Sequence, residues 1–131
     1  MINDQVIELI LRNPDLSYEE RRKNGLLNHS PVKKSELIRV VVDIVEKNGF
    51  FPRSKQGCME KYPCGEGSYM QKICENKYEY GGFIFHPVNN FMEYKKKIFQ
   101  NVEQAATYYI EWLFKGIKHK YLAGIRIIDE E

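Results

Sequence analysis

Three consecutive segments near the end of the chain decide the expected fold: Tyr94-Lys95-Lys96-Lys97-Ile98-Phe99, then Asn101 to Lys115, then Leu122-Ala123-Gly124-Ile125-Arg126-Ile127-Ile128. The first and the last have the pattern of strands. The middle segment predicts an amphipathic helix, because its apolar residues recur at spacings of three and four and share one face: Val102, Ala105, Ala106, Tyr109, Ile110 and Leu113. Asn101 can cap its first turn, and Gly116 can end it.

Three further helices are expected upstream of this unit. The first carries a short apolar stripe, which consists of Val6, Leu9 and Ile10. The second begins at a capping box of Ser17 and Glu20, is polar and therefore exposed, and stops at Asn24-Gly25. The third begins at Ser35. Its wide apolar face indicates deep burial against a sheet: Leu37, Val40, Val41, Ile44 and Val45.

A β-hairpin is expected in the second half of the chain. Its arms are Tyr69–Glu75 and Tyr78–His86, and Asn76-Lys77 is the predicted turn, because asparagine tolerates a positive φ. Gly81-Gly82 indicates a bulge or a place where another group approaches closely. The 53–67 stretch before the hairpin shows no periodicity, and Gly65-Glu66-Gly67-Ser68 is interpreted as a turn.

These elements predict the α+β class, with N-terminal helices packed on a roughly four-stranded mixed sheet and one helix between the last two strands. If the strands that flank this helix are neighbours, they run parallel and the crossover is right-handed. A length of 131 residues is typical of one domain, so residues 1–131 are expected to form a single domain.

Composition and charge limit the classes of function. The 20 basic and 18 acidic residues leave a formal charge of +2, which is too balanced to indicate nucleic acid or an anionic membrane. The first residues lack the basic start and apolar core of a signal peptide, and no apolar run reaches the ~20 residues of a membrane span. We therefore expect a cytoplasmic protein without a membrane partner. Three cysteines, an odd number, fit free thiols in that compartment.

The cysteine and histidine residues form no recognisable metal or catalytic motif. Zinc sites commonly include a closely spaced ligand pair, and the candidate ligands lack one: Cys58, Cys64, Cys74 and His86. No sequence context marks a cysteine as a nucleophile paired with His86. Gly65-Glu66-Gly67-Ser68 lacks the lysine of a phosphate-binding loop. The sequence therefore predicts no catalytic residue, no metal and no cofactor, and a cysteine-dependent enzyme is kept as an alternative.

The densest basic cluster is Lys95-Lys96-Lys97, with further lysines at 115, 118 and 120. Consecutive residues of a strand point to opposite faces, so these three lysines cannot form one patch. Lysine is also the usual protection of an edge strand against aggregation. We therefore expect no nucleic-acid partner, and a small nucleic-acid-associated regulatory protein is the alternative function.

A mixture of tyrosine and carboxylate side chains occurs in the loop and the hairpin. Tyrosine supplies a large contact area at low entropic cost, and carboxylates can pair with a basic partner. The sequence therefore predicts a partner-binding surface there, with a solvated hairpin face as the alternative. The residues predicted to bind are Glu60, Tyr62, Glu66, Tyr69, Glu75, Tyr78 and Glu79.

The strand–helix–strand unit also carries a family resemblance, on Phe99-Gln100-Asn101-Val102-Glu103-Gln104-Ala105-Ala106-Thr107-Tyr108-Tyr109-Ile110-Glu111-Trp112-Leu113. A strand ending in phenylalanine, this helix and an apolar strand resemble the closing unit of small immunity proteins from bacterial polymorphic-toxin and contact-dependent inhibition systems. The resemblance implies a cytosolic protein that binds a cognate toxin and blocks its active site without catalysis. Many such proteins neutralise basic nucleases with strongly acidic surfaces, and this chain departs from them in its balanced charge.

Overall fold

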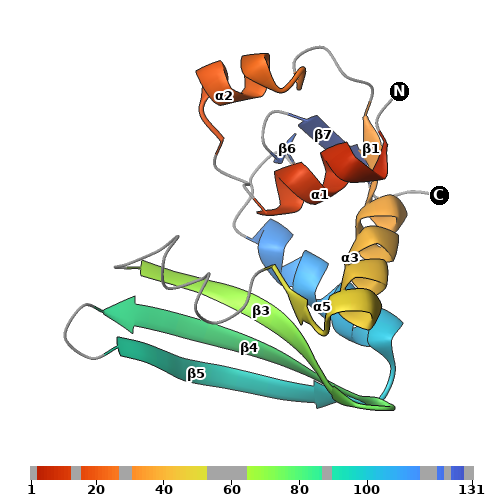
Figure 1. The fold of residues 1–131 in the computed structure, drawn as a ribbon, viewed down its shortest axis with the longest axis vertical. Helices are drawn as coiled ribbons and strands as arrows, with labels where there is room; N and C mark the ends of the chain where they lie inside the picture. Colours follow the sequence, from red (N-terminus) through yellow and green to blue (C-terminus); the bar gives the residue numbers. More distant parts are fainter. Residues whose placement is uncertain are drawn as a thin grey trace. The chain divides into compact units, whose positions relative to one another are not determined.

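The computed structural model describes residues 3–12, 16–26, 31–52, 65–86, 90–115, 121–122 and 125–128 (Figure 1). The chain divides into two compact units, residues 1–40 with 110–131 and residues 41–109. Two long helices, α3 (Lys34–Asn48) and α5 (Val102–Lys115), supply residues to both units. The single-domain organisation of residues 1–131 stays a prediction.

The first unit contains two short helices and a small sheet. The helices are α1 (Asp4–Arg12) and α2 (Tyr18–Lys23), and the strands are β1 (Val32–Lys33), β6 (Tyr121–Leu122) and β7 (Ile125–Ile128). The strand order is β1-β7-β6, with β1 parallel and β6 antiparallel to β7. Ile125 and Ile127 are buried and Arg126 between them is exposed, which is the alternation of a strand with one covered face.

Ion pairs connect α3 to α1 and to α5. Arg39 of α3 donates to both carboxylate oxygens of Asp4 in α1, at 2.8 and 3.0 Å. These hydrogen bonds hold the pKa of Asp4 below its usual value. Lys34 Nζ lies 3.5 Å from the Glu111 carboxylate of α5. Because both pairs lie at the surface, they orient the helices more than they stabilise them.

The second unit is built on a four-stranded antiparallel sheet. Its strands are β2 (Phe50–Phe51), β3 (Gly65–Cys74), β4 (Lys77–His86) and β5 (Asn90–Phe99), in that spatial order. The register places one row of side chains across all four strands: Phe51, Met70, Tyr80 and Lys97. The next row lies on the other side of the sheet: Phe50, Gln71, Glu79 and Ile98. The first row defines the helix-side face, since Phe51 and Tyr80 both contact Tyr109 of α5.

The α+β class is confirmed, and α5 lies between β5 and β6 in the chain. The four-stranded sheet is antiparallel, and the parallel pairing, between β1 and β7, belongs to the other unit. The single strand predicted over 122–128 is wrong, because β6 and β7 pair with each other. The strands that flank α5 consequently belong to different sheets, and no parallel crossover joins them.

The burial of residues in α3 and α1 can be compared with the core faces predicted for these helices. In α3 all five predicted core residues are buried: Leu37, Val40, Val41, Ile44 and Val45. In α1 the buried residues are Ile7, Ile10 and Leu11. The predicted set of Val6, Leu9 and Ile10 is therefore right for Ile10 and wrong for the other two, which are only partly covered. Both sets have the same helical spacing, so periodicity alone could not choose between them.

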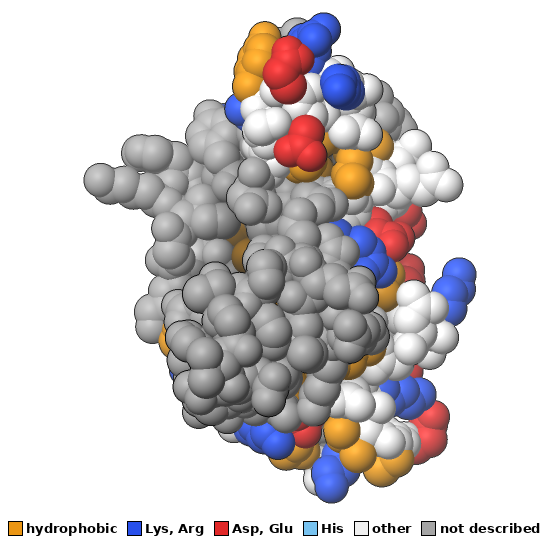
Figure 2. Space-filling view, turned by 60° about the vertical axis from the view of Figure 1, so that its left-hand side comes forward, with side chains coloured by type: hydrophobic (Ala, Val, Ile, Leu, Met, Phe, Trp, Pro, Cys, Tyr) orange, Lys and Arg blue, Asp and Glu red, His pale blue; other side chains and the backbone are white. Residues whose placement is uncertain are grey.

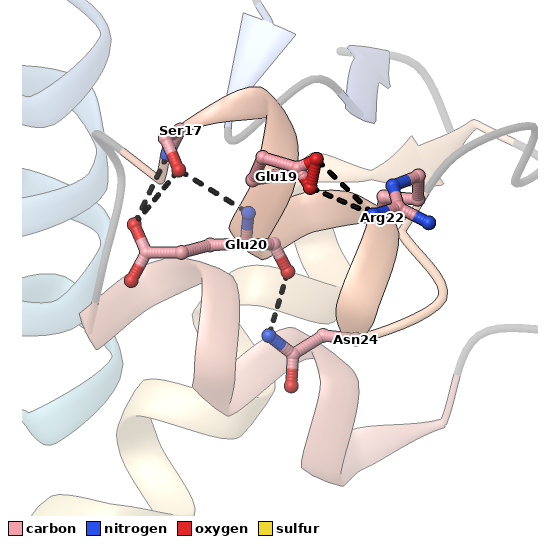
Figure 3. Close-up of polar contacts among 5 residues, drawn as sticks. All are labelled: Ser17, Glu19, Glu20, Arg22 and Asn24. Atoms are coloured by element: carbon pink, nitrogen blue, oxygen red, sulfur yellow. Dashed lines mark hydrogen bonds and ion pairs between the residues drawn. The ribbon is translucent and has the colours of Figure 1, made fainter.

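Both predicted helix caps are present. In α2 the Ser17 hydroxyl accepts from the Glu20 backbone N–H at 3.2 Å, and the Glu20 carboxylate accepts from the Ser17 N–H at 3.3 Å (Figure 3). Because α2 has no buried residue, these bonds and its internal ion pair hold a helix that lacks a core face. In α5 the Asn101 side chain accepts from the Gln104 backbone N–H at 3.0 Å.

The β3–β4 hairpin turns one residue earlier than predicted, at Glu75-Asn76, and Asn76 has a positive φ of 61°. The register shifts between Lys72 and Cys74, so Ile73 is the additional residue of a bulge beside the turn. A second shift in register lies between Gly82 and Phe83, where the additional residue is Tyr94 of β5. The bulge therefore lies in the strand opposite the two glycines and not, as predicted, in their own strand.

Residues 65–68 form the start of β3, so the turn predicted for them is wrong. In the described part of the chain, no helix combines the length and the apolar sequence that crossing a membrane requires.

Ala106 lies on the buried face of α5 with 0% of its surface exposed. We expect Ala106→Asp to lower the free energy of unfolding by more than about 3 kcal/mol, because it buries an unpaired charge. Gln104→Asp, on the exposed face of the same helix, is the matched control and should change stability little. Thermal and urea unfolding measure both variants, and an Ala106→Asp protein with an unchanged melting temperature would contradict the assignment of this face.

Candidate binding surface

The residues predicted to bind a partner separate into buried and accessible groups. Tyr69 and Tyr78 are 0% and 4% exposed, so neither ring can supply the contact area that the sequence interpretation assigned to it. Glu75 is exposed at the hairpin turn, and Glu79 is partly exposed on β4. Two of the predicted positions, Glu60 and Tyr62, lie outside the described residues. Glu66 belongs to β3, but its side chain lies outside the described part of the structure.

Tyr69 is held from three directions on the face opposite the helices. Its ring stacks on Phe50 of β2, with the centroids 5.3 Å apart and the planes at 11°. Its hydroxyl donates to Glu79 Oε2 at 2.6 Å. The ring also lies over the backbone of Gly81, its register partner on β4. A Cβ atom at Gly81 would overlap this ring, so the position requires glycine.

A second aromatic–glycine pair repeats this arrangement with the two strands exchanged. Gly67 of β3 lies opposite Phe83 of β4, and a Cβ atom at Gly67 would come 2.8 Å from the Phe83 ring. Phe83 and Tyr69 form one buried apolar cluster, against which Phe50 packs. Each glycine therefore leaves the space that the ring of the other strand fills. The close approach predicted at the Gly81-Gly82 pair is confirmed for Gly81.

On the helix-side face, Glu46 of α3 connects the helix to the hairpin. Its two carboxylate oxygens accept from Lys72 Nζ and from the Tyr78 hydroxyl, each at 2.9 Å. Lys72 Nζ also donates to Glu75 at 3.0 Å, which links the hairpin turn to α3 through one ammonium group. The Glu46 side chain is 41% exposed and that of Glu75 is 84% exposed. The Glu46–Lys72 bond is therefore the less screened of the two.

The contacts of this network shift three pKa values. The hydrogen bonds from Lys72 and then Tyr78 lower the pKa of Glu46. Burial, followed by the hydrogen bond to Glu46, raises the pKa of the Tyr78 phenol. The hydrogen bonds to Glu46 and Glu75 raise the pKa of Lys72. All three shifts favour an ionised carboxylate, a neutral phenol and a charged ammonium, which is the protonation pattern that the network needs.

Aromatic contacts pack α5 on the same face of the sheet. The ring of Tyr80 lies 4.9 Å from that of Tyr108 and 6.3 Å from that of Tyr109. Phe51 meets Tyr109 edge-on at 5.6 Å. These offset and perpendicular geometries are favoured between aromatic rings and add to the area that the rings bury. On its helix-side face the hairpin is thus held by hydrogen bonds to Glu46 of α3 and by aromatic contacts with Tyr108 and Tyr109 of α5.

The lysines of β5 alternate between the two faces, as strand geometry predicts. Lys97 belongs to the helix-side row, and its Nζ lies 4.7 Å from the centroid of the Tyr108 ring in a cation–π contact. Lys96, which pairs with Gly81, belongs to the opposite face. Lys95, Lys96 and Lys97 therefore do not form one basic patch.

The accessible part of the opposite face lies beside the hairpin turn. Large hydrophobic side chains are exposed at three described positions, and two of them lie here: Ile73 at 43% and Ile98 at 50%. We name this area the hairpin-end surface and define it by Gln71, Ile73, Glu79 and Ile98. In the view of Figure 2, orange, blue and red side chains are interspersed at the lower end, so no single charge sign dominates the described residues there.

The chemistry of metals and thiols adds little to this surface. Within the described ranges, no group of three or more histidine, cysteine, aspartate or glutamate side chains could hold a metal ion. Cys74, near the hairpin turn, is an exposed free thiol. Cys58, Cys64 and the side chain of His86 lie outside the described residues. The predicted absence of a metal site and of catalysis stays a prediction.

Comparisons of this chain with family models, with curated proteins and with solved structures found no match. The resemblance to immunity proteins is therefore an expectation from the residues of the strand–helix–strand unit.

The packing of Tyr69 over Gly81 gives a prediction for stability. The Tyr69 ring cannot move aside, because it is fully buried and stacked, and its hydroxyl is hydrogen-bonded. We expect Gly81→Ala to lower the free energy of unfolding by about 1–3 kcal/mol. In a Tyr69→Ala background the same change should cost less, because the clash is absent. Urea unfolding of the four proteins measures this coupling, and additive effects would show that the two residues do not contact.

The Glu46 network gives a prediction for pH dependence. Because the folded state lowers the pKa of Glu46, its stabilising effect is complete above the usual value of 4.5 and is lost as the pH falls through the lower folded value. Near neutral pH, Glu46→Gln should lower the urea midpoint, and the difference from the unmodified protein should close as the pH falls below the lowered pKa of Glu46 in the folded state. Glu75→Gln, which affects the more exposed bond of Lys72, is the control and should have the smaller effect. A difference that stays constant with pH would refute the role of the carboxylate.

Proposed function

We propose that this chain is a protein-binding module, and that it neutralises a cognate bacterial toxin domain by covering the active site of the toxin. The observation that carries the binding role is the hairpin-end surface, where Ile73 and Ile98 are exposed and Glu79 is the register partner of Ile98. The toxin as partner comes from the resemblance of the strand–helix–strand unit. The proposal assigns no catalytic residue and no cofactor.

The composition of the hairpin-end surface suits recognition of a protein. Ile98, Glu79 and Gln71 are register partners on three adjacent strands, so they form one continuous row. Strands lie ~4.8 Å apart, which places the ends of this row about 10 Å from each other. Apolar side chains framed by polar groups are the pattern of a binding patch with a dry centre and a polar rim.

The contacts that hold the hairpin on its helix-side face make the opposite surface suitable for binding. The β3–β4 hairpin is held by Glu46 and by the rings of α5, and the Glu79 carboxylate is oriented by the Tyr69 hydroxyl. A side chain that is already fixed loses little conformational entropy when a partner arrives, so a larger part of the contact energy becomes affinity.

The charges of the surface indicate the chemistry of the partner. Glu79 presents a carboxylate in the same row as the exposed Ile98, although the whole chain has a formal charge of +2. Local rather than global electrostatics would therefore select a toxin whose contact site carries arginine or lysine next to apolar groups. Such pairs mainly affect the rate of association and its salt dependence.

The test is co-expression with the toxin domain encoded beside this gene, followed by co-purification through a tag on the toxin. We expect a complex that survives at micromolar concentration. Ile98→Asp should weaken it by at least about tenfold, because it replaces an exposed apolar contact of the hairpin-end surface with a charge. Tyr18→Asp changes an exposed large side chain of α2, 60% accessible, and is the matched control that should leave affinity unchanged.

Two results would overturn the proposal at different levels. If no complex forms with the adjacent toxin domain, the toxin is not the partner. If a complex forms and Ile98→Asp binds as tightly as Tyr18→Asp, then the hairpin-end surface is not the contact. Circular dichroism of both variants verifies that the substitutions leave the fold intact.

A further inference from the structure

The Glu79 carboxylate is partly exposed, yet a buried group holds it in place. Its Oε2 atom accepts from the Tyr69 hydroxyl at 2.6 Å. The Tyr69 ring is 0% exposed, stacks on Phe50 and lies over Gly81, so the donor has a fixed position. A glutamate side chain otherwise has many rotamers, and fixing one of them costs entropy. The bond thus leaves Oε1 as a preorganised acceptor, and within the described residues no donor is bonded to it.

The two register partners of Glu79 supply complementary groups on the same face of the sheet. Gln71 of β3 lies on one side and Ile98 of β5 on the other. Directly opposed side chains of neighbouring strands have their Cβ atoms about 4.5–5.5 Å apart, so all are within reach of one side chain of a partner. Gln71 adds a neutral side-chain oxygen as a second acceptor, and the half-exposed Ile98 adds an apolar surface.

An arginine side chain matches this arrangement better than a lysine side chain. The guanidinium group is planar and carries its N–H donors in a rigid fork, so it can donate to two acceptors at once. The ammonium group of lysine is a compact and strongly hydrated point charge. The methylene stem of arginine also packs well along apolar surface. Lys96 lies on the same face in the next row, but it is not bonded to Glu79.

We propose that Glu79 is the receptor for an arginine side chain of the binding partner. The guanidinium group donates to Glu79 Oε1 and to the side-chain oxygen of Gln71, and the stem of the arginine packs on Ile98. Tyr69 is a positioning residue, because its hydroxyl holds the carboxylate without touching the partner. The inference rests on the proposed role of the hairpin-end surface in protein binding, and it does not require the partner to be a toxin.

The probes are short peptides in which valine flanks arginine, lysine or citrulline, with both peptide ends blocked. Each is titrated into the complete isotope-labelled chain, and NMR follows the side-chain signals of Gln71, Glu79 and Ile98. The arginine peptide should bind at least about threefold more tightly than the lysine peptide, because only its fork reaches both acceptors. Citrulline has nearly the shape of arginine without its charge, so its peptide should bind most weakly.

Variants of the protein separate the role of Glu79 from that of charge in general. Glu79→Gln should reduce the affinity for the arginine peptide to that for the citrulline peptide. Glu75→Gln removes another carboxylate of the same hairpin, 84% exposed, and is the matched control that should leave the affinity unchanged. Tyr69→Phe keeps the stacked ring and removes the donor, so it should lower the preference for arginine over lysine. A purely structural role of Tyr69 would not change this ratio.

The inference is overturned if the arginine peptide shifts none of the followed signals, or if the lysine or citrulline peptide binds as tightly. It is equally overturned if Glu75→Gln weakens binding as much as Glu79→Gln. These outcomes are distinct from failure of the proposed function. A toxin complex that responds to Ile98→Asp, with no binding of the arginine peptide, would exclude the arginine receptor alone. Binding of the arginine peptide in the absence of a toxin complex would exclude the toxin alone.

Discussion

The packing of Tyr69 over Gly81 is the constraint on which the four-stranded sheet depends. A shift of β3 against β4 by one residue would exchange the two faces of the strand, and a shift by two would place Tyr69 opposite Glu79 or Phe83, where a side chain fills the space. The reciprocal pair of Gly67 and Phe83 imposes the same register. Two glycines and two rings therefore determine which residues of the hairpin face the helices.

Once this register is set, the roles of the other side chains follow. Tyr78 and Tyr80 point to α3 and α5, where Glu46 and the rings of Tyr108 and Tyr109 receive them. Glu79 points the other way, and the Tyr69 hydroxyl orients its carboxylate. Tyr69 was predicted to touch a partner, and the fold instead uses it as a positioning residue beneath the surface. The accessible recognition groups are left beside the turn.

Ile98 ends the row that starts at Gln71 and passes through Glu79, and it lies on β5, the last strand in the order of the four-stranded sheet. The neighbouring Lys97 lies on the other face of this strand, where its ammonium group contacts the Tyr108 ring in a cation–π interaction. Adjacent residues of one strand thus have different roles, because one packs toward α5 and the other remains exposed on the face opposite the helices.

The sequence by itself determined the elements whose signals are local. These signals depend on neighbours within a few residues. They specify the capping box at Ser17 and Glu20, the cap at Asn101, the core face of α3, the central part of the core face of α5 and the positive φ of Asn76. Tertiary structure decided the rest. Ile7 rather than Val6 is buried in α1, the 122–128 segment folds into two strands of a separate sheet, and Tyr69 is buried whereas Glu79 remains accessible. In each case the sequence allows several patterns of equal local energy, and only contacts with residues distant in the chain favour one of them.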